Sequence, residues 1–261
     1  MRLDCLALKE LDINYVAKIF NPIFDDEKIH NVSALADFCF TRMKEELTPL
    51  DKEEPDMESF AISTQIFYNF LMIKTKCIEE RHHYNSVKAV QMFDLYIKDT
   101  LHDSIYSYFK KRLQEVNCVE CGEEGVKGMV DGSVSPWAIS WGTYVVFHLE
   151  RYDGEGFMNK RNCRYPANID LIDYIEEKDQ AKEDFECLYK LIGVIYHDVE
   201  DHLLDGQYGA YVLRKGAIER AEDDEEAGPD GPEKEMVWHN FTHENVTKVK
   251  ESDALSATEG A

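Results

Sequence analysis

The chain has 261 residues, of which 44% are hydrophobic and 11% aromatic, enough apolar surface for a folded core. This composition excludes disorder over the whole length. The 29 Lys and Arg against 52 Asp and Glu give a formal net charge of −23, so no nucleic-acid or membrane partner is expected. Apolar runs such as 144–147 are too short to span a bilayer, and the protein is expected to be intracellular, in the cytoplasm or nucleus.

Residues 1–59 are expected to be mainly helical, because apolar residues there recur every three or four positions. One amphipathic segment begins with Ser33 as its N-cap and ends before Pro49. From Phe60 onward short alternating runs, such as 92–97, predict strands. A further helix is predicted at 101–113, with Leu113 as its last apolar position.

Glycines after residue 121 predict a hairpin-like region, and strands are predicted at 143–152, 189–197 and 208–214. Residues 219–235 combine an acidic run with Gly-Pro turns. They are expected to be a disordered insertion, since apolar patterning resumes at Val237. Helices first and antiparallel strands afterwards predict a single domain of α+β type.

The seven cysteines are few, odd in number and scattered, which favours reduced thiols over a disulfide framework. Cys118 and Cys121 have the spacing with which two thiolates share a tetrahedral ion. A zinc site would add Cys77 and either Glu80 or a nearby histidine at position 82 or 83. Structural zinc normally has four Cys or His ligands, so a site that has lost its metal is favoured. No cofactor is expected to be required, and zinc is the one candidate.

Several segments resemble, in the same order, the motifs of the ubiquitin-specific proteases. The apolar strand 191–197 ends in His and is followed by Gly206-Gln207-Tyr208, which is similar to the family's strand, loop and Gly-His-Tyr box. Residues 145–152 resemble the family's Leu-Lys-Arg-Phe strand, and residues 165–171 resemble its Phe-Pro and Leu-Asp-Leu segment. Residues 238–246 resemble the closing Trp-Tyr-x-Phe-x-Asp-x-x-Val box, and residues 36–38 resemble the Gln-Gln-Asp-Ala-x-Glu-Phe helix. Cys77, with Cys118 and Cys121, falls where the family's fingers have their paired cysteines.

The resemblance covers about residues 30–255. It implies a papain-like fold with a helical thumb at 1–59, β fingers at 60–135 and a mainly antiparallel palm at 136–261, incomplete at both ends. It also implies a thiolate nucleophile, a histidine that takes its proton, and an Asp or Asn that orients the histidine. In this chain Gln207 stands at the histidine position and His243 at the acid position. No Gly-Asn-Thr-Cys-Tyr box precedes Asp37, and Cys5 lacks the glycine and asparagine of an oxyanion pocket.

Glutamine cannot accept and return a proton near neutral pH, and His243 and His197 are expected to be structural. The sequence therefore predicts a catalytically inactive family member that acts, if at all, by binding ubiquitin or a scaffold partner. The resemblance implies a channel for the ubiquitin tail, with Asp37, Tyr208 and Tyr211 as candidates. Two alternatives stay open. One is an active cysteine-type deubiquitinase whose nucleophile is Cys5 or lies in sequence outside this chain, and the other is an interaction module that does not bind ubiquitin.

Overall fold

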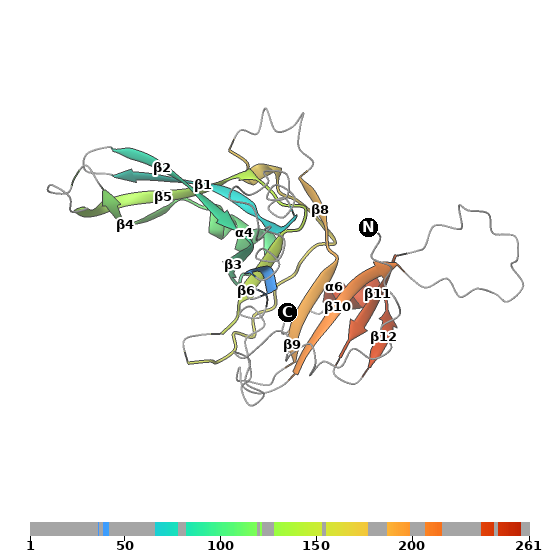
Figure 1. Cartoon of the computed structure of the whole chain (residues 1–261). Coiled ribbons are helices and arrows are strands. Elements are labelled where there is room, and N and C mark those ends of the chain that lie inside the picture. The colour runs from blue at the N-terminus through green and yellow to red at the C-terminus, as the bar shows by residue number, and fades with distance from the viewer. Residues whose placement is uncertain are drawn as a thin grey trace, which may run out of the picture.

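The computed structural model describes residues 36, 39–41, 66–77, 82–118, 121, 128–152, 155–176, 187–198, 207–215, 236–242 and 245–256 (Figure 1). Of the predicted N-terminal helices, only Ala36 and residues 39–41 are described, and these are helical. Cys5, Asp37, Glu80, His243 and the predicted insertion at 219–235 lie outside the described residues. The division at residues 59 and 135 stays a prediction.

The N-terminal sheet is a four-stranded antiparallel arm with the order β2-β1-β5-β4. In Figure 1 it extends away from the rest of the described chain. Its base is buried at Leu71 and Ala138, whereas most of β2 is exposed. The arm is therefore held mainly by its strand ladder toward the tip. Its strands are β1 (Asn69–Cys77), β2 (His83–Val90), β4 (Arg112–Cys118) and β5 (Gly128–Ser140).

The central layer pairs β3 (Met92–Tyr96) in parallel with β6 (Val146–Glu150), and α4 (Leu101–Phe109) packs against it. Thr100 caps α4 because its hydroxyl accepts the Asp103 backbone N–H. Phe93 is fully buried and contacts the rings of neighbouring aromatic residues, namely Tyr108, Phe109, Trp141 and Phe147. This aromatic cluster is the centre of the main core.

The C-terminal sheet is antiparallel, with the order β12-β11-β10-β9. A small core forms where Leu213 and Trp238 pack with Ala254 of α6 (Glu251–Ser256). A short pair, β7 (Asn168–Asp170) with β8 (Leu188–Lys190), and the 3-10 turn η1 (Ile172–Tyr174) lie before this sheet in the chain. Its four strands are β9 (Gly193–Asp198), β10 (Gln207–Lys215), β11 (Met236–Phe241) and β12 (Val246–Val249).

The strand predicted at 143–152 is the shorter β6, Val146–Glu150, and two further predicted elements change more. The predicted helix at 101–113 ends at Phe109, since Lys110 adopts an extended backbone and Leu113, already in β4, pairs with Ser133 of β5. The predicted strand at 189–197 is two strands, because the chain changes partner between them: the Leu191 N–H donates to the carbonyl of Ala167, and β9 then pairs with β10. In both cases tertiary pairing overrides the local pattern.

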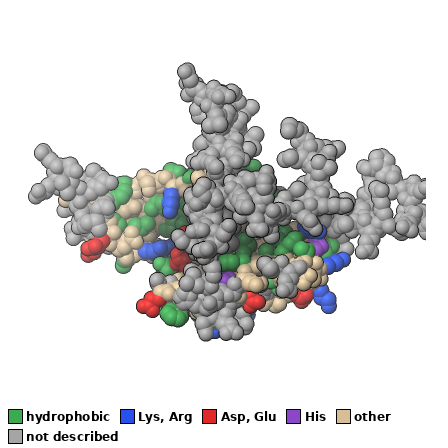
Figure 2. All heavy atoms as spheres, turned by 60° about the horizontal axis from the view of Figure 1, so that its bottom comes forward, with side chains coloured by type: hydrophobic (Ala, Val, Ile, Leu, Met, Phe, Trp, Pro, Cys, Tyr) green, Lys and Arg blue, Asp and Glu red, His purple; other side chains and the backbone are tan. Residues whose placement is uncertain are grey.

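The described surface mixes side chains of every type. Figure 2 shows hydrophobic side chains between scattered acidic and basic ones on the face that it presents. No described helix is long and apolar enough to cross a membrane.

Candidate functional site

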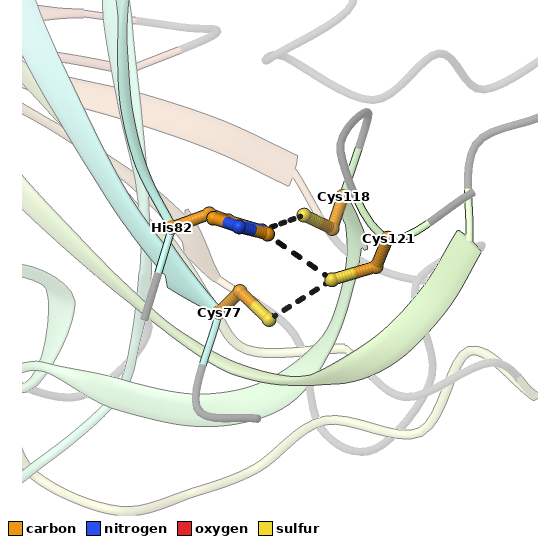
Figure 3. A group of neighbouring side chains, drawn as sticks. All are labelled: Cys77, His82, Cys118 and Cys121. Atoms are coloured by element: carbon orange, nitrogen blue, oxygen red, sulfur yellow. Dashed lines mark hydrogen bonds between the residues drawn. The ribbon is translucent and has the colours of Figure 1, made fainter. Parts of the chain in front are cut away.

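Three thiols and one imidazole meet near the tip of the N-terminal sheet (Figure 3). Cys77 and Cys118 are buried, while Cys121 and His82 are half-buried. Cys121 Sγ lies 3.6 Å from Cys77 Sγ and 3.5 Å from His82 Nδ1, and Cys118 Sγ lies 3.4 Å from the same nitrogen. All four ligand atoms lie within 4.8 Å of one another.

These separations fit a tetrahedral metal ion. With Zn–S bonds of about 2.3 Å and a Zn–N bond of about 2.05 Å, a regular tetrahedron has S–S edges of about 3.8 Å and S–N edges of about 3.6 Å. The contacts of His82 and the Cys77–Cys121 contact are within about 0.2 Å of these edges. The described cluster can therefore hold a metal ion, with His82 as its fourth ligand.

The strand ladder explains why residues so far apart in sequence converge. Lys76 pairs with His83, so the next residues, Cys77 and His82, face each other, and the Cys77 N–H donates to the His82 carbonyl at 2.9 Å. Cys118 ends β4, where it pairs with Gly128 of β5. Because β5 pairs with both β1 and β4, the two ligand pairs come to the same end of the sheet.

The close approach of the thiols also raises the pKa of one of them. Burial, together with hydrogen bonds and repulsion from Cys118 and Cys77, raises the pKa of Cys121 to about 12. A divalent cation at the centre would favour the thiolates instead, because its charge outweighs their mutual repulsion. The sequence favoured a site without metal because no fourth Cys or His ligand was assigned. The structure brings His82 beside the three thiols, where it can be that fourth ligand. The candidate Glu80 lies outside the described residues.

The second candidate site surrounds Gln207 at the start of β10. Gln207 is exposed and pairs with Asp198, while the next residue, Tyr208, pairs with His197. Side chains alternate along a strand, so Gln207 lies on one face of the C-terminal sheet and Tyr208 with His197 on the other. His239 pairs with Val212, which shares the face of Tyr208. The sheet therefore carries its two described histidines on the face opposite Gln207.

The face of Gln207 is occupied by a tyrosine that crosses β10. The Tyr196 hydroxyl donates to Asn240 Oδ1 at 3.1 Å, and the ring passes directly over Gly209. A Cβ at Gly209 would lie 2.3 Å from this ring, so the glycine allows the close approach, and a larger residue would displace the tyrosine. Tyr211 packs beside Tyr196, with ring centroids 5.2 Å apart.

The opposite face carries a hydrogen-bonded aromatic cluster that sequence reasoning did not find. His197 is buried, its Nδ1 shares a hydrogen bond with the Tyr152 hydroxyl, and its ring stacks on Tyr208 at 4.1 Å between centroids. Burial raises the pKa of Tyr152 to about 12. The sequence feature that could have indicated this cluster is that Tyr152 and His197 each come at the end of an apolar segment. The predicted channel residues Tyr208 and Tyr211 thus lie on opposite faces of β10.

The three described thiols outside the metal cluster are poor nucleophiles. Cys163 and Cys187 are buried and Cys39 is half-buried. Burial raises the pKa of each of these three thiols, which disfavours the reactive thiolate. No described cysteine outside the cluster therefore has the depressed pKa that a cysteine nucleophile needs.

Comparison with known proteins matches this architecture to one family. The family model described as ubiquitin carboxyl-terminal hydrolase matches residues 12–260. The chain belongs to this family. Solved ubiquitin-specific proteases share its α+β fold: the SAGA DUB module of Ubp8, Sgf11, Sus1 and Sgf73 bound to monoubiquitin has a TM-score of 0.63 at 16% identity, over 88% of this chain and 47% of that one.

The same module bound to ubiquitin aldehyde has a TM-score of 0.58 at 16% identity, over 87% of this chain and 46% of that one. This member of the hydrolase family thus spans about half the length of the solved chains that it matches. No curated protein sequence matches it.

Proposed function

We propose that this chain is a non-hydrolytic member of the ubiquitin carboxyl-terminal hydrolase family that binds ubiquitin. The observation that carries the proposal is Gln207, which stands where the family motif has its proton-accepting histidine. Gln207 has no acid–base chemistry near neutral pH, and the described imidazoles of this sheet, His197 and His239, lie on its other face. The raised pKa values of Cys39, Cys163 and Cys187, the described thiols outside the metal cluster, support the same conclusion.

Ubiquitin binding is supported by the fold and by the partners of its structural neighbours. Both neighbouring structures hold ubiquitin or ubiquitin aldehyde. The net charge of −23 also steers cationic partners toward the chain, and by the family resemblance the basic tail of ubiquitin is such a partner. Tyr208 and Tyr211 are the described aromatic candidates for that contact, one on each face of β10.

We also propose that the cluster of Cys77, His82, Cys118 and Cys121 holds one zinc ion as a structural site. The ion would join the end of the β1–β2 hairpin to the end of β4, at the tip where β2 buries little. Structural zinc sites contribute directly to folding, so this ion would stabilise the arm and take no part in a reaction.

Two measurements on the full chain test the ubiquitin proposal. Titration of fluorescently labelled ubiquitin, followed by anisotropy, is expected to show binding in the micromolar range. A ubiquitin probe with a C-terminal electrophile is expected to give no covalent adduct. An adduct that disappears in Cys5→Ala would establish an active deubiquitinase instead, and absence of binding at high micromolar concentration would leave an interaction module that does not recognise ubiquitin.

Two variants locate the binding face. Tyr208→Ala is expected to weaken ubiquitin binding about tenfold, the size of loss typical of a tyrosine anchor. The matched control, Tyr106→Ala on α4, removes a tyrosine that is 61% exposed, and binding should be unchanged. Equal losses in both variants would contradict a contact through β10.

A further inference from the structure

A polar cavity of about 180 Å³ lies where α4 meets the parallel pair β3 and β6. Figure 1 shows these three elements together at the base of the arm. Asp94 pairs with His148 and Tyr96 pairs with Glu150, so alternation brings these four side chains to one face, while Phe93 and Leu95 are buried on the other. The lining includes Asp94, Tyr96, Ser107, Tyr108, Arg112 and Glu150.

Three polar groups of this lining have no partner within the described part of the chain. Among the described residues, the Glu150 carboxylate, the Ser107 hydroxyl and the Tyr96 phenol take part in no hydrogen bond or ion pair. Asp94 uses one carboxylate oxygen for His148 Nδ1, at 2.8 Å, which leaves its second oxygen available. Polar groups that converge on one cavity without satisfying one another form a ready binding site for a complementary ligand.

The cation of the lining is already engaged. Arg112 donates to the Tyr108 carbonyl at 2.8 Å, and its guanidinium lies over the Tyr108 ring, 5.6 Å from the centroid. The formal charges of Asp94, Glu150 and Arg112 sum to −1, so the lining as a whole favours a cation. The acidic charge of the whole chain also steers cationic ligands toward it.

We propose that this cavity binds the side chain of a single lysine from a basic peptide segment. An ammonium group has three N–H donors, and Asp94, Glu150 and Ser107 supply three acceptors. The exposed Tyr96 ring offers an apolar and cation-attracting surface to the rest of the side chain. A volume of 180 Å³ is below the roughly 300 Å³ at which pockets begin to hold drug-sized ligands, so one side chain fits better than a cofactor. The site is independent of ubiquitin binding through β10.

The test uses the full chain, labelled with 15N, and two small probes. Nα-acetyl-lysine methylamide is expected to shift amide resonances of β3, β6 and α4 with a dissociation constant in the low millimolar range. Nα-acetyl-norleucine methylamide has a similar stem without the charge, and its binding should be about tenfold weaker, because it lacks the charge-assisted hydrogen bonds. Added salt should weaken lysine binding. Equal binding of the two probes would overturn the proposal.

Matched variants assign the binding to this cavity. Glu150→Gln should weaken the lysine probe about tenfold, whereas Glu115→Gln, the same charge change at an exposed position of β4, should leave it unchanged. Tyr96→Ala, at a side chain that is 66% exposed, gives a second variant that does not disturb the core. It should weaken binding several-fold by loss of the ring contact. Unchanged binding in both cavity variants, or resonance shifts confined to other elements, would show that lysine does not bind here.

Discussion

The two four-stranded sheets of this protein present different kinds of chemistry. The N-terminal sheet brings four ligand atoms within 4.8 Å of one another near its tip, in a geometry that fits a tetrahedral ion. The C-terminal sheet has Gln207 exposed at the start of β10, its described histidines on the other face, and Tyr196 across Gly209 on the face of the glutamine. Among the described residues, four candidate metal ligands meet in the first sheet, whereas no imidazole lies on the face of Gln207 in the second.

The difference also extends to how each sheet is stabilised. The arm buries apolar side chains at its base, and β2 is largely exposed. The C-terminal sheet has its own small core of Leu213, Trp238 and Ala254. The stability of a sheet with few buried side chains at its tip depends on cross-links between its strands. The stability of a sheet with a packed face depends on how well its side chains fit together. This contrast predicts which substitutions harm each sheet.

The largest effect is expected at the metal ligands. Cys118→Ser and His82→Ala should reduce bound zinc, measured by mass spectrometry of the purified protein, from about one ion per chain to none, since each removes one of four ligands. Cys39→Ser, which changes a thiol outside the cluster, should keep the full zinc content. A zinc-free chain with unchanged thermal stability would show that hairpin pairing alone holds the arm.

The next effect should fall on the C-terminal core. Trp238→Ala removes a side chain that is 4% exposed, and should lower the free energy of unfolding by about 3–5 kcal/mol, as cavity-forming substitutions do. Val246→Ala on β12, at a side chain that is 55% exposed, should change it by less than about 0.5 kcal/mol. Chemical denaturation measures both. A small loss in Trp238→Ala would mean that this core contributes little.

A smaller effect is expected in the arm at Gly132 of β5. A Cβ there would lie 2.3 Å from Val116 Cγ2 and 2.8 Å from the Lys76 carbonyl oxygen, so both neighbouring strands would have to shift. Gly132→Ala should therefore cost about 1–3 kcal/mol, the usual range for overpacking. Gly193→Ala, whose Cβ would make only an ordinary contact at 3.6 Å, is the matched control in β9. Similar denaturation midpoints for the two variants would contradict this prediction.

The smallest effect concerns Tyr152 at alkaline pH. Burial raises its pKa from 10 to about 12 in the folded chain. Between these values the unfolded chain has lost the phenolic proton that the folded chain keeps, so stability should fall as the pH rises from about 10 to about 12. Tyr152→Phe should remove this part of the alkaline loss in pH-dependent thermal unfolding, at the cost of the hydrogen bond to His197. An identical alkaline slope in the two proteins would show that Tyr152 titrates normally.

The sequence alone allowed several elements to be predicted. Alternation of apolar residues predicted the strand β3, because a half-buried strand repeats every two residues, and the strand predicted at 208–214 is β10. Cysteine spacing pointed to Cys118 and Cys121, with Cys77 as a third candidate ligand, and the family resemblance pointed to Gln207. These features depend on residues close together in the chain.

Only the tertiary structure decided the fourth ligand and the orientation of the histidines. Glu80 and His82 lie three and five residues after Cys77 in sequence, and the hydrogen bond from the Cys77 N–H to the His82 carbonyl, next to the β1–β2 ladder, brings His82 beside the thiols. In the same way, pairing with β10 places His197 away from Gln207, and pairing with β5 draws Leu113 out of the predicted helix. Spacing along the chain restricts which residues can meet, but the register between strands distant in sequence determines which of them do.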